Sequence, residues 1–187
     1  LYSNQGQTGT WNQASSIIFK NANRTFSREE ATKLGNADYI LKRPSDHEFF
    51  RAHITNKTIE TEASRKFLTI FHSYSGHGPY LLGNIPDVFH QSVDQKLSKK
   101  NVKAIVGKVV NNLEKVEAYD STIRYIDFVV AEAIKTISSS AYPRIFIYFS
   151  DHGESLYAGR GHDSSRFIHE MVRVPFIIYF NEAAKKS

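Results

Sequence analysis

Three short runs of apolar residues along the chain predict buried β-strands. The first is Phe67–His72, which runs into the Gly- and Pro-containing loop Ser75–Pro79, and the others are Arg144–Phe149 and Val174–Phe180. Runs of this length that are bounded by turn residues are typical of strands buried on both faces. Pro175 is tolerated because it stands near the start of the third run.

A long helical pattern lies between the first two of these strands. Apolar residues recur there at intervals of three and four over about six turns, and they are Val116, Tyr119, Ile123, Ile126, Val130, Ile134 and Ile137. Strand, long helix and strand together predict an α/β protein with a mainly parallel sheet and helices on both faces. Ser27, with Glu30 at the capping-box position, and the segment Ser45–Glu48 mark two further helix starts.

The composition limits the class of protein. The chain has 187 residues, 41% of them hydrophobic, with 13 Phe, 10 Tyr and no Cys. This length fits one domain with a core of its own, and the aromatic content excludes a disordered chain. No apolar run approaches the roughly 20 residues that span a bilayer. The absence of cysteine excludes a disulfide scaffold, a zinc ribbon and a thiol nucleophile.

The net charge of +5 is a mild basic excess. Ordinary surface lysines account for such an excess, and attraction to phosphate-rich or membrane-surface partners is the functional alternative. The longest basic tracts are Lys99–Lys100 and Lys185–Lys186. They are too short to follow a nucleic-acid backbone, so we expect no nucleic-acid partner.

Histidine and aspartate residues follow two of the predicted strands. Ligands of open parallel sheets gather beyond the carboxyl ends of the strands, so we expect His77 to approach Asp151 and His152. One carboxylate and one imidazole suit Zn²⁺ or Mn²⁺. The alternative is that Asp151 caps a helix and His152 lies on the surface. Gly153, the next residue, is expected to let the backbone turn sharply.

Two histidines have glycine neighbours that permit close approach to a ligand. His77 lies between Gly76 and Gly78, and His162 follows Gly161. His162 is a candidate for a second imidazole over the metal, oriented by a carboxylate such as Asp163. The alternative for both histidines is an exposed side chain in a turn. His47, His53, His90 and His169 lack such context and are interpreted as surface or structural residues.

Four segments resemble a known family, in the same order along the chain. Phe149–Leu156 resembles the SDHGESL signature of the phosphoethanolamine transferases, which belong to the sulfatase branch of the alkaline-phosphatase superfamily. Tyr2–Gln5 resembles their strand and loop after the nucleophile region. Phe71–Pro79 resembles their H-x-x-G-x-H-G-P loop, and Tyr119–Asp127 resembles their Y-D-N-T-I-x-Y-x-D helix.

The resemblance implies a site and a reaction. Asp151 and His152 would bind zinc, with Mn²⁺ as an alternative, and His77 and His162 would lie near the transferred phosphoryl group. Gln5 and Thr8 are candidates for polar contacts to the substrate. The implied reaction transfers phosphoethanolamine from a phospholipid to lipid A or another cell-envelope glycan through a phosphothreonine. It would take place at the periplasmic face of the bacterial inner membrane.

The resemblance also implies that residues 1–187 are the C-terminal part of a sulfatase-like catalytic domain. The family's threonine nucleophile, an acidic zinc ligand and the membrane anchor precede the segment at Leu1, so we expect this chain alone to be inactive and to bind zinc weakly. A short loop before His162 and the lack of cysteine depart from the lipid A enzymes. A phosphoglycerol transferase or sulfatase of the same superfamily is one alternative, and a non-catalytic binding domain on the same scaffold is another.

Overall fold

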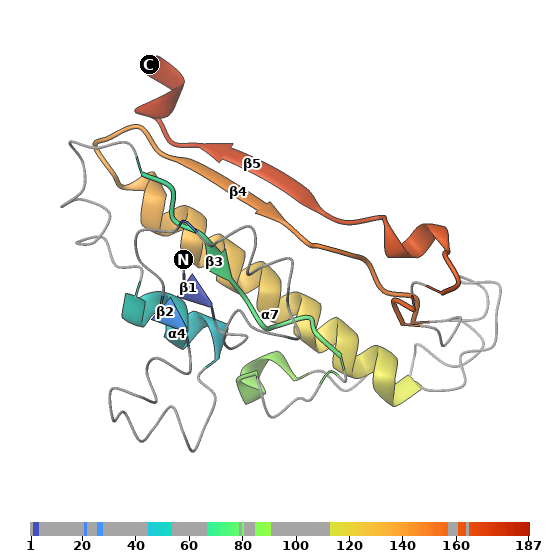
Figure 1. Ribbon diagram of the computed structural model, residues 1–187. Helices are drawn as coiled ribbons and strands as arrows, with labels where there is room; N and C mark the ends of the chain where they lie inside the picture. The colour runs from blue at the N-terminus through green and yellow to red at the C-terminus, as the bar shows by residue number, and fades with distance from the viewer. Residues whose placement is uncertain are drawn as a thin grey trace. The chain divides into compact units, whose positions relative to one another are not determined.

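A computed structural model describes residues 2–3, 21, 26–27, 45–53, 67–78, 80, 85–90, 113–156, 161–163 and 165–187 (Figure 1). The chain forms two compact units, Leu1–His77 and Gly78–Ser187, which are described separately below. Gln5, Thr8 and Glu30 lie outside the described residues, so what the sequence predicts for them stays a prediction.

A small parallel sheet organises the unit Leu1–His77. Its strands are β1 (Tyr2–Ser3), β2 (Phe26–Ser27) and β3 (Phe71–His72), in the order β2-β1-β3. Ser3 pairs with Ser27 on one side and with His72 on the other. The prediction of parallel pairing is confirmed for this sheet. One detail differs: only the last two residues of the predicted strand Phe67–His72 pair. Ser27 is the last residue of β2, and the helix start predicted at Ser27 stays a prediction because the residues after it lie outside the described part of the chain.

Helix α4 (Asp46–His53) begins where the sequence predicted a helix start. The Ser45 amide donates to Glu48 Oε2 at 2.8 Å, and the Glu48 amide donates in return to Ser45 Oγ at 3.4 Å. This reciprocal pair is a capping box, which satisfies amides that have no partner within the helix. Acidic residues in the first turn complement the positive end of the helix dipole.

Aromatic packing joins α4 to β3. Phe49 is fully buried and Phe50 is 6% exposed. Their ring centroids lie 5.8 and 5.6 Å from that of Phe71 in β3. The helix therefore packs against the strand that leads into the loop carrying His77.

Helix α7 (Leu113–Ser138) organises the unit Gly78–Ser187 and confirms the long predicted helix. Its buried face differs from the predicted stripe, because Ile123 is 42% exposed while Ser121 and Thr122 are buried. Each of the two hydroxyls donates to the backbone carbonyl four residues earlier at 2.8 Å, so neither is left unsatisfied inside the protein. In the described part of the chain, no helix combines the length and the apolar composition needed to cross a membrane.

Strands β4 (Ile145–Phe149) and β5 (Phe176–Phe180) form an antiparallel pair. The register runs from Ile145 opposite Phe180 to Phe149 opposite Phe176. This corrects the expectation that the strand before Asp151 pairs in parallel fashion. Parallel neighbours need a long crossover, usually a helix, whereas the described residues between β4 and β5 contain only the 3₁₀ turn His169–Met171.

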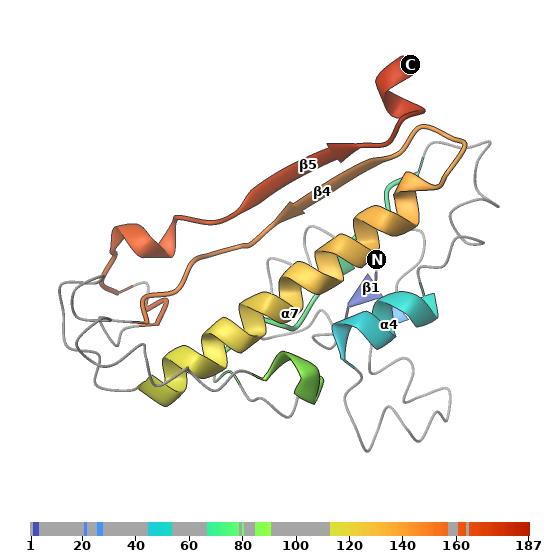
Figure 2. The ribbon, with the colours of Figure 1, turned by 180° about the vertical axis from the view of Figure 1, so that it is seen from behind.

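One face of the β4–β5 pair is covered and the other is open. Figures 1 and 2 show α7 running along the pair, and the half-buried Phe146 and Tyr148 alternate with exposed neighbours in β4. The exposed set forms three cross-strand pairs of apolar side chains: Ile145 with Phe180, Ile147 with Ile178 and Phe149 with Phe176. The predicted helices on both faces are therefore seen on one face only, within the described residues.

Asn181, directly after β5, joins three elements of this unit. Its side chain is fully buried. The amide oxygen accepts from two backbone amides and the amide nitrogen donates to three backbone carbonyls, at 2.9–3.3 Å; the partners are Arg144, Ala184, Ile137, Ser140 and Tyr142. One residue thus satisfies carbonyls at the end of α7 and also fixes the start of β4 beside the end of β5.

We expect Asn181→Ala to lower the free energy of unfolding by about 2–4 kcal/mol, because it leaves several buried backbone groups without partners. Urea denaturation measures this change. The matched control is Glu182→Gln in the next residue, whose exposed pair with Lys185 should contribute little to stability. Equal unfolding midpoints for the two variants would contradict the role assigned to Asn181.

Candidate metal centre

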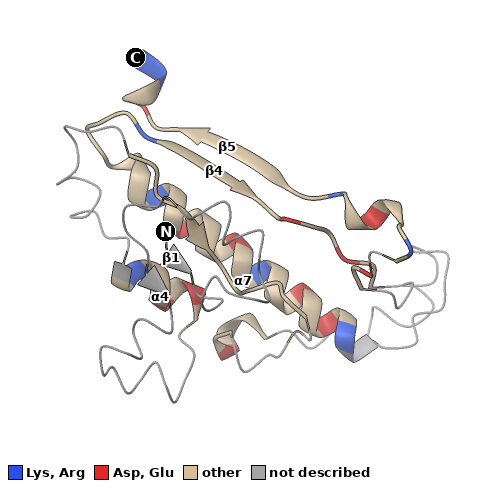
Figure 3. Cartoon of the chain, in the orientation of Figure 1, with Lys and Arg blue, Asp and Glu red and all other residues tan. Residues whose placement is uncertain are grey.

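Asp151 and His152 follow β4 after Ser150, and their side chains lie close together. Asp151 is exposed and His152 is half-buried. Asp151 Oδ1 accepts from the His152 amide at 3.1 Å and lies 3.9 Å from His152 Nε2. Figure 3 shows that β4 and β5 carry no charged residues and that acidic residues appear where β4 ends. The apolar strand therefore delivers this polar pair to its carboxyl end, as the sequence predicted.

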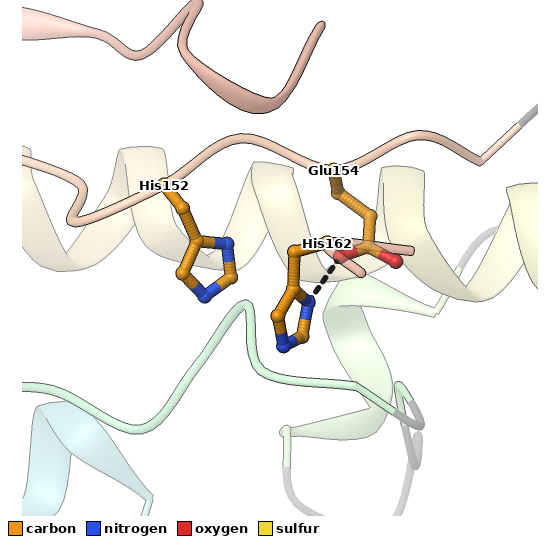
Figure 4. Close-up of side chains that lie close together, drawn as sticks. All are labelled: His152, Glu154 and His162. Carbon is orange, nitrogen blue, oxygen red and sulfur yellow. Dashed lines mark hydrogen bonds and ion pairs between the residues drawn. The ribbon is translucent and has the colours of Figure 1, made fainter. Parts of the chain in front are cut away.

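A single backbone bridge brings His162 to this region. Ser155 and Gly161 form an antiparallel bridge, with the Ser155 amide donating to the Gly161 carbonyl at 2.9 Å. Gly161 has a φ of +61°, which glycine adopts without a steric penalty. The bridge sets His162 opposite Glu154, and His162 Nδ1 lies 2.9 Å from Glu154 Oε2 (Figure 4).

His152, Glu154 and His162 form a compact group of metal-ligand side chains. The imidazole centroids of the two histidines are 4.1 Å apart and their planes differ by 27°. One ligand atom from each of the three residues lies within 4.8 Å of the others. Bonds of about 2.1 Å in a tetrahedral zinc site put ligand atoms about 3.4 Å apart, so small side-chain movements would complete a site. Two imidazoles and a carboxylate suit Zn²⁺ or Mn²⁺.

Hydrogen bonds select the same tautomer for both histidines. His162 Nδ1 faces the Glu154 carboxylate, and His152 Nδ1 lies 3.0 Å from the Gly153 carbonyl. Both partners can only accept, so each Nδ1 carries the hydrogen and the neutral ring has its lone pair on Nε2. Figure 4 shows the two rings side by side with Nε2 directed away from Glu154. A carboxylate or carbonyl on Nδ1 is the usual support of a metal-binding histidine.

The carboxylate beside His162 corrects the sequence-based expectation. Asp163 was the predicted orienting residue, but its Oδ1 accepts from the Ser165 amide at 2.9 Å, while Glu154 is the partner of His162. Glu154 is eight residues away in sequence and reaches His162 only through the Ser155–Gly161 bridge. The signal available in the sequence was the glutamate of the Asp151–Glu154 segment itself.

Gly153 is needed for close packing more than for a sharp turn. Its amide donates to the Met171 carbonyl at 2.7 Å. A Cβ at this position would overlap the Glu170 carbonyl oxygen and would lie 3.1 Å from that of Arg173. Among the described glycines, positive φ is found at Gly76 and Gly161, so the predicted reason for Gly153 is replaced by contact with the 3₁₀ turn.

Tyr80 is a site neighbour that the sequence analysis missed. It is 4% exposed, has a φ of +50° and packs edge-on against Tyr119 of α7 with centroids 5.2 Å apart. Burial, followed by the nearby Glu154 carboxylate, raises the pKa of Tyr80 far above its usual range, so the hydroxyl stays protonated. Among the described residues, the buried oxygen has no hydrogen-bond partner of standard geometry, although the Glu154 carboxylate is close enough to contribute to the raised pKa. Its only sequence signal was its position directly after Gly76–Pro79.

The positions of the other predicted site residues relative to this group stay predictions. His77 is exposed in the loop after β3, in the unit Leu1–His77, and its approach to Asp151 stays a prediction. Gln5 and Thr8 lie outside the described residues, so their substrate contacts also stay predictions.

Comparisons with known proteins identify a family for the whole chain and a relative for part of it. The sequence model of the Sulfatase family matches residues 1–187. The chain is also similar to "Phosphoethanolamine transferase EptA" of Helicobacter pylori, with 28% identity over 133 residues, which are 69% of this chain and 24% of that protein. The chain therefore spans about a quarter of the length of the curated relative it matches. No solved structure matches the chain significantly.

We expect Gly153→Ala to destabilise the protein by about 1–3 kcal/mol, because the added methyl group displaces the backbone of the 3₁₀ turn. Thermal unfolding measures the loss. Gly78→Ala is the matched control, since its Cβ would meet nothing nearer than Tyr80 Cζ at 3.9 Å. A Gly153→Ala protein as stable as the control would rule out the close approach as the reason for this glycine.

Proposed function

Because the chain belongs to the sulfatase family, we propose that it carries the metal-binding segment of a phosphoethanolamine transferase. The family implies an α/β fold of the alkaline-phosphatase type. The observation that carries the proposal is the gathering of His152, Glu154 and His162 directly beyond the carboxyl end of β4. Similarity to a protein named as a phosphoethanolamine transferase supports this activity over others in the family.

The proposed reaction moves phosphoethanolamine from a phospholipid to lipid A or another glycan of the cell envelope. A threonine outside residues 1–187 attacks the donor phosphorus and releases diacylglycerol. The acceptor then takes the group from the resulting phosphothreonine. In this proposal the complete protein acts at the periplasmic face of the bacterial inner membrane, and residues 1–187 form the C-terminal part of its catalytic domain.

Asp151 and His152 are the proposed ligands of a divalent metal, Zn²⁺ or Mn²⁺. Asp151 Oδ1 and His152 Nε2 are 3.9 Å apart, close to the separation of neighbouring ligands in a metal site. The metal, when bound, would lower the pKa of the attacking hydroxyl and polarise the phosphoryl oxygens. The Gly153 carbonyl keeps the His152 ring turned so that Nε2 remains the coordinating atom.

His162 and His77 are the proposed catalytic histidines. Glu154 accepts from His162 Nδ1 and so orients the ring, and Nε2 is the atom that would give a proton to a leaving oxygen. His77 would serve the same chemistry or stabilise negative charge on the phosphoryl group as a cation. Gln5 and Thr8, which follow the segment Tyr2–Ser3, are proposed to contact the substrate.

The test measures diacylglycerol release from phosphatidylethanolamine by the complete protein. We expect His162→Gln to lower kcat by about 100-fold or more, in the range of general acid–base catalysis. His169→Gln, at an exposed histidine in the 3₁₀ turn, is the control and should retain activity. Turnover of phosphatidylglycerol in place of phosphatidylethanolamine would establish a phosphoglycerol transferase, and turnover of an aryl sulfate would establish a sulfatase. No turnover of any of the three would favour a binding domain.

We expect Asp151→Asn to weaken Zn²⁺ binding more than Glu154→Gln does. Asp151 is proposed to touch the metal, whereas loss of an orienting group costs about 10–100-fold in affinity. Competition with a chromophoric chelator measures both constants, and Glu182→Gln, far from the site in sequence and exposed, is the control. The reverse order would mean that the ligands are His152, Glu154 and His162, with Asp151 outside the coordination sphere.

A further inference from the structure

A buried carboxylate holds the loop that carries His77. Asp46, in the first turn of α4, is only 1% exposed. Its carboxylate oxygens accept from the Tyr74 amide at 3.0 Å and from the Ser75 amide at 2.6 Å. Hydrogen bonds from amides to an ionised carboxylate are stronger than those between neutral groups. This contact joins segments that are 28 and 29 residues apart in sequence.

The anchored residues lie next to His77 in space as well as in sequence. The His77 amide donates to the Tyr74 carbonyl at 3.2 Å, and Gly76 between them has a φ of +97°. The rings of Tyr74 and His77 are stacked, with centroids 5.7 Å apart and planes 14° apart. The backbone position of Tyr74 therefore sets both the turn and the ring surface against which the exposed His77 lies.

Helix capping does not explain Asp46. The start of α4 is already capped by Ser45 and Glu48, which bond each other reciprocally. Aspartate is rarely buried this fully, because a charge without partners is costly in the interior. The amides of Tyr74 and Ser75 and the positive end of the helix offset that cost. The Asp46 carboxylate thus binds the Tyr74 and Ser75 amides of the loop and does not cap helix α4.

We propose that Asp46 is the positioning residue of His77, acting through the Tyr74–Ser75 backbone. The proposal rests on the proposed function for the part His77 plays in phosphoryl transfer. Its structural claim is independent of that function: without the Asp46 carboxylate, the turn Tyr74–His77 loses its fixed conformation and the His77 ring loses its place on Tyr74.

The test compares Asp46→Asn with Ser45→Ala in the complete protein. Asparagine keeps the size of the side chain but turns an amide donor toward one of the two backbone donors. Ser45→Ala weakens the same helix start without touching the loop, so it reports the effect of stability alone. Hydrogen exchange at the amides of Tyr74 and Ser75, and the ring-current shift of the His77 Hε1 proton, are read without substrate or metal.

We expect Asp46→Asn to accelerate exchange of the amide that faces the new donor at least 10-fold and to abolish the ring-current shift, while Ser45→Ala changes neither. With substrate, kcat should fall at least 10-fold at nearly constant KM, because His77 acts on the reacting group and not on binding. Wild-type exchange and shift in Asp46→Asn, or equal effects in both variants, would overturn the proposal. If loop and ring respond but no variant turns over phosphatidylethanolamine, the positioning role stands and the proposed function fails.

Discussion

The buried side chain of Asn181 is the constraint on which the unit Gly78–Ser187 depends. It ties carbonyls in the last turn of α7 and just after that helix to the residue before β4 and to the end of β5. Once Ile145 is held opposite Phe180, the pleat fixes every later pair up to Phe149 opposite Phe176. The position of Asp151 is therefore determined at the opposite end of β4, about six residues along the strand.

The candidate site is built from backbone contacts more than from side-chain packing. Gly153 lies against the carbonyl of Glu170, and Gly161 pairs with Ser155 while adopting a conformation that other residues rarely adopt. These two contacts place His152 and His162 with their Nδ1 atoms already engaged. Both rings are thus held in place before any ligand binds, which keeps the entropic cost of ordering them small.

Local patterns predicted the elements, and long-range pairing decided what the sequence could not reveal. Helix α7 and the strands around Ile147 and Ile178 follow from periodicity and turn residues. The antiparallel pairing of β4 with β5 could not be predicted, because an apolar run does not indicate whether a strand pairs in parallel or antiparallel fashion. Likewise, Ser121 and Thr122 are buried because each hydroxyl bonds within its own helix, which hydrophobicity alone cannot indicate. Glu154 and Asp46 act on residues brought near by a bridge or by tertiary packing.

The bridge between Ser155 and Gly161 separates the residues that position the His162–Glu154 pair from the residues that can vary. Its hydrogen bond closes the segment at its base, so the His162–Glu154 pair depends on the two bridged residues and not on the five residues between them. The entropy of closing a loop grows only slowly with its length. Insertions or deletions in that stretch are therefore inexpensive, and the length of the segment can change in evolution while the His162–Glu154 pair stays in register.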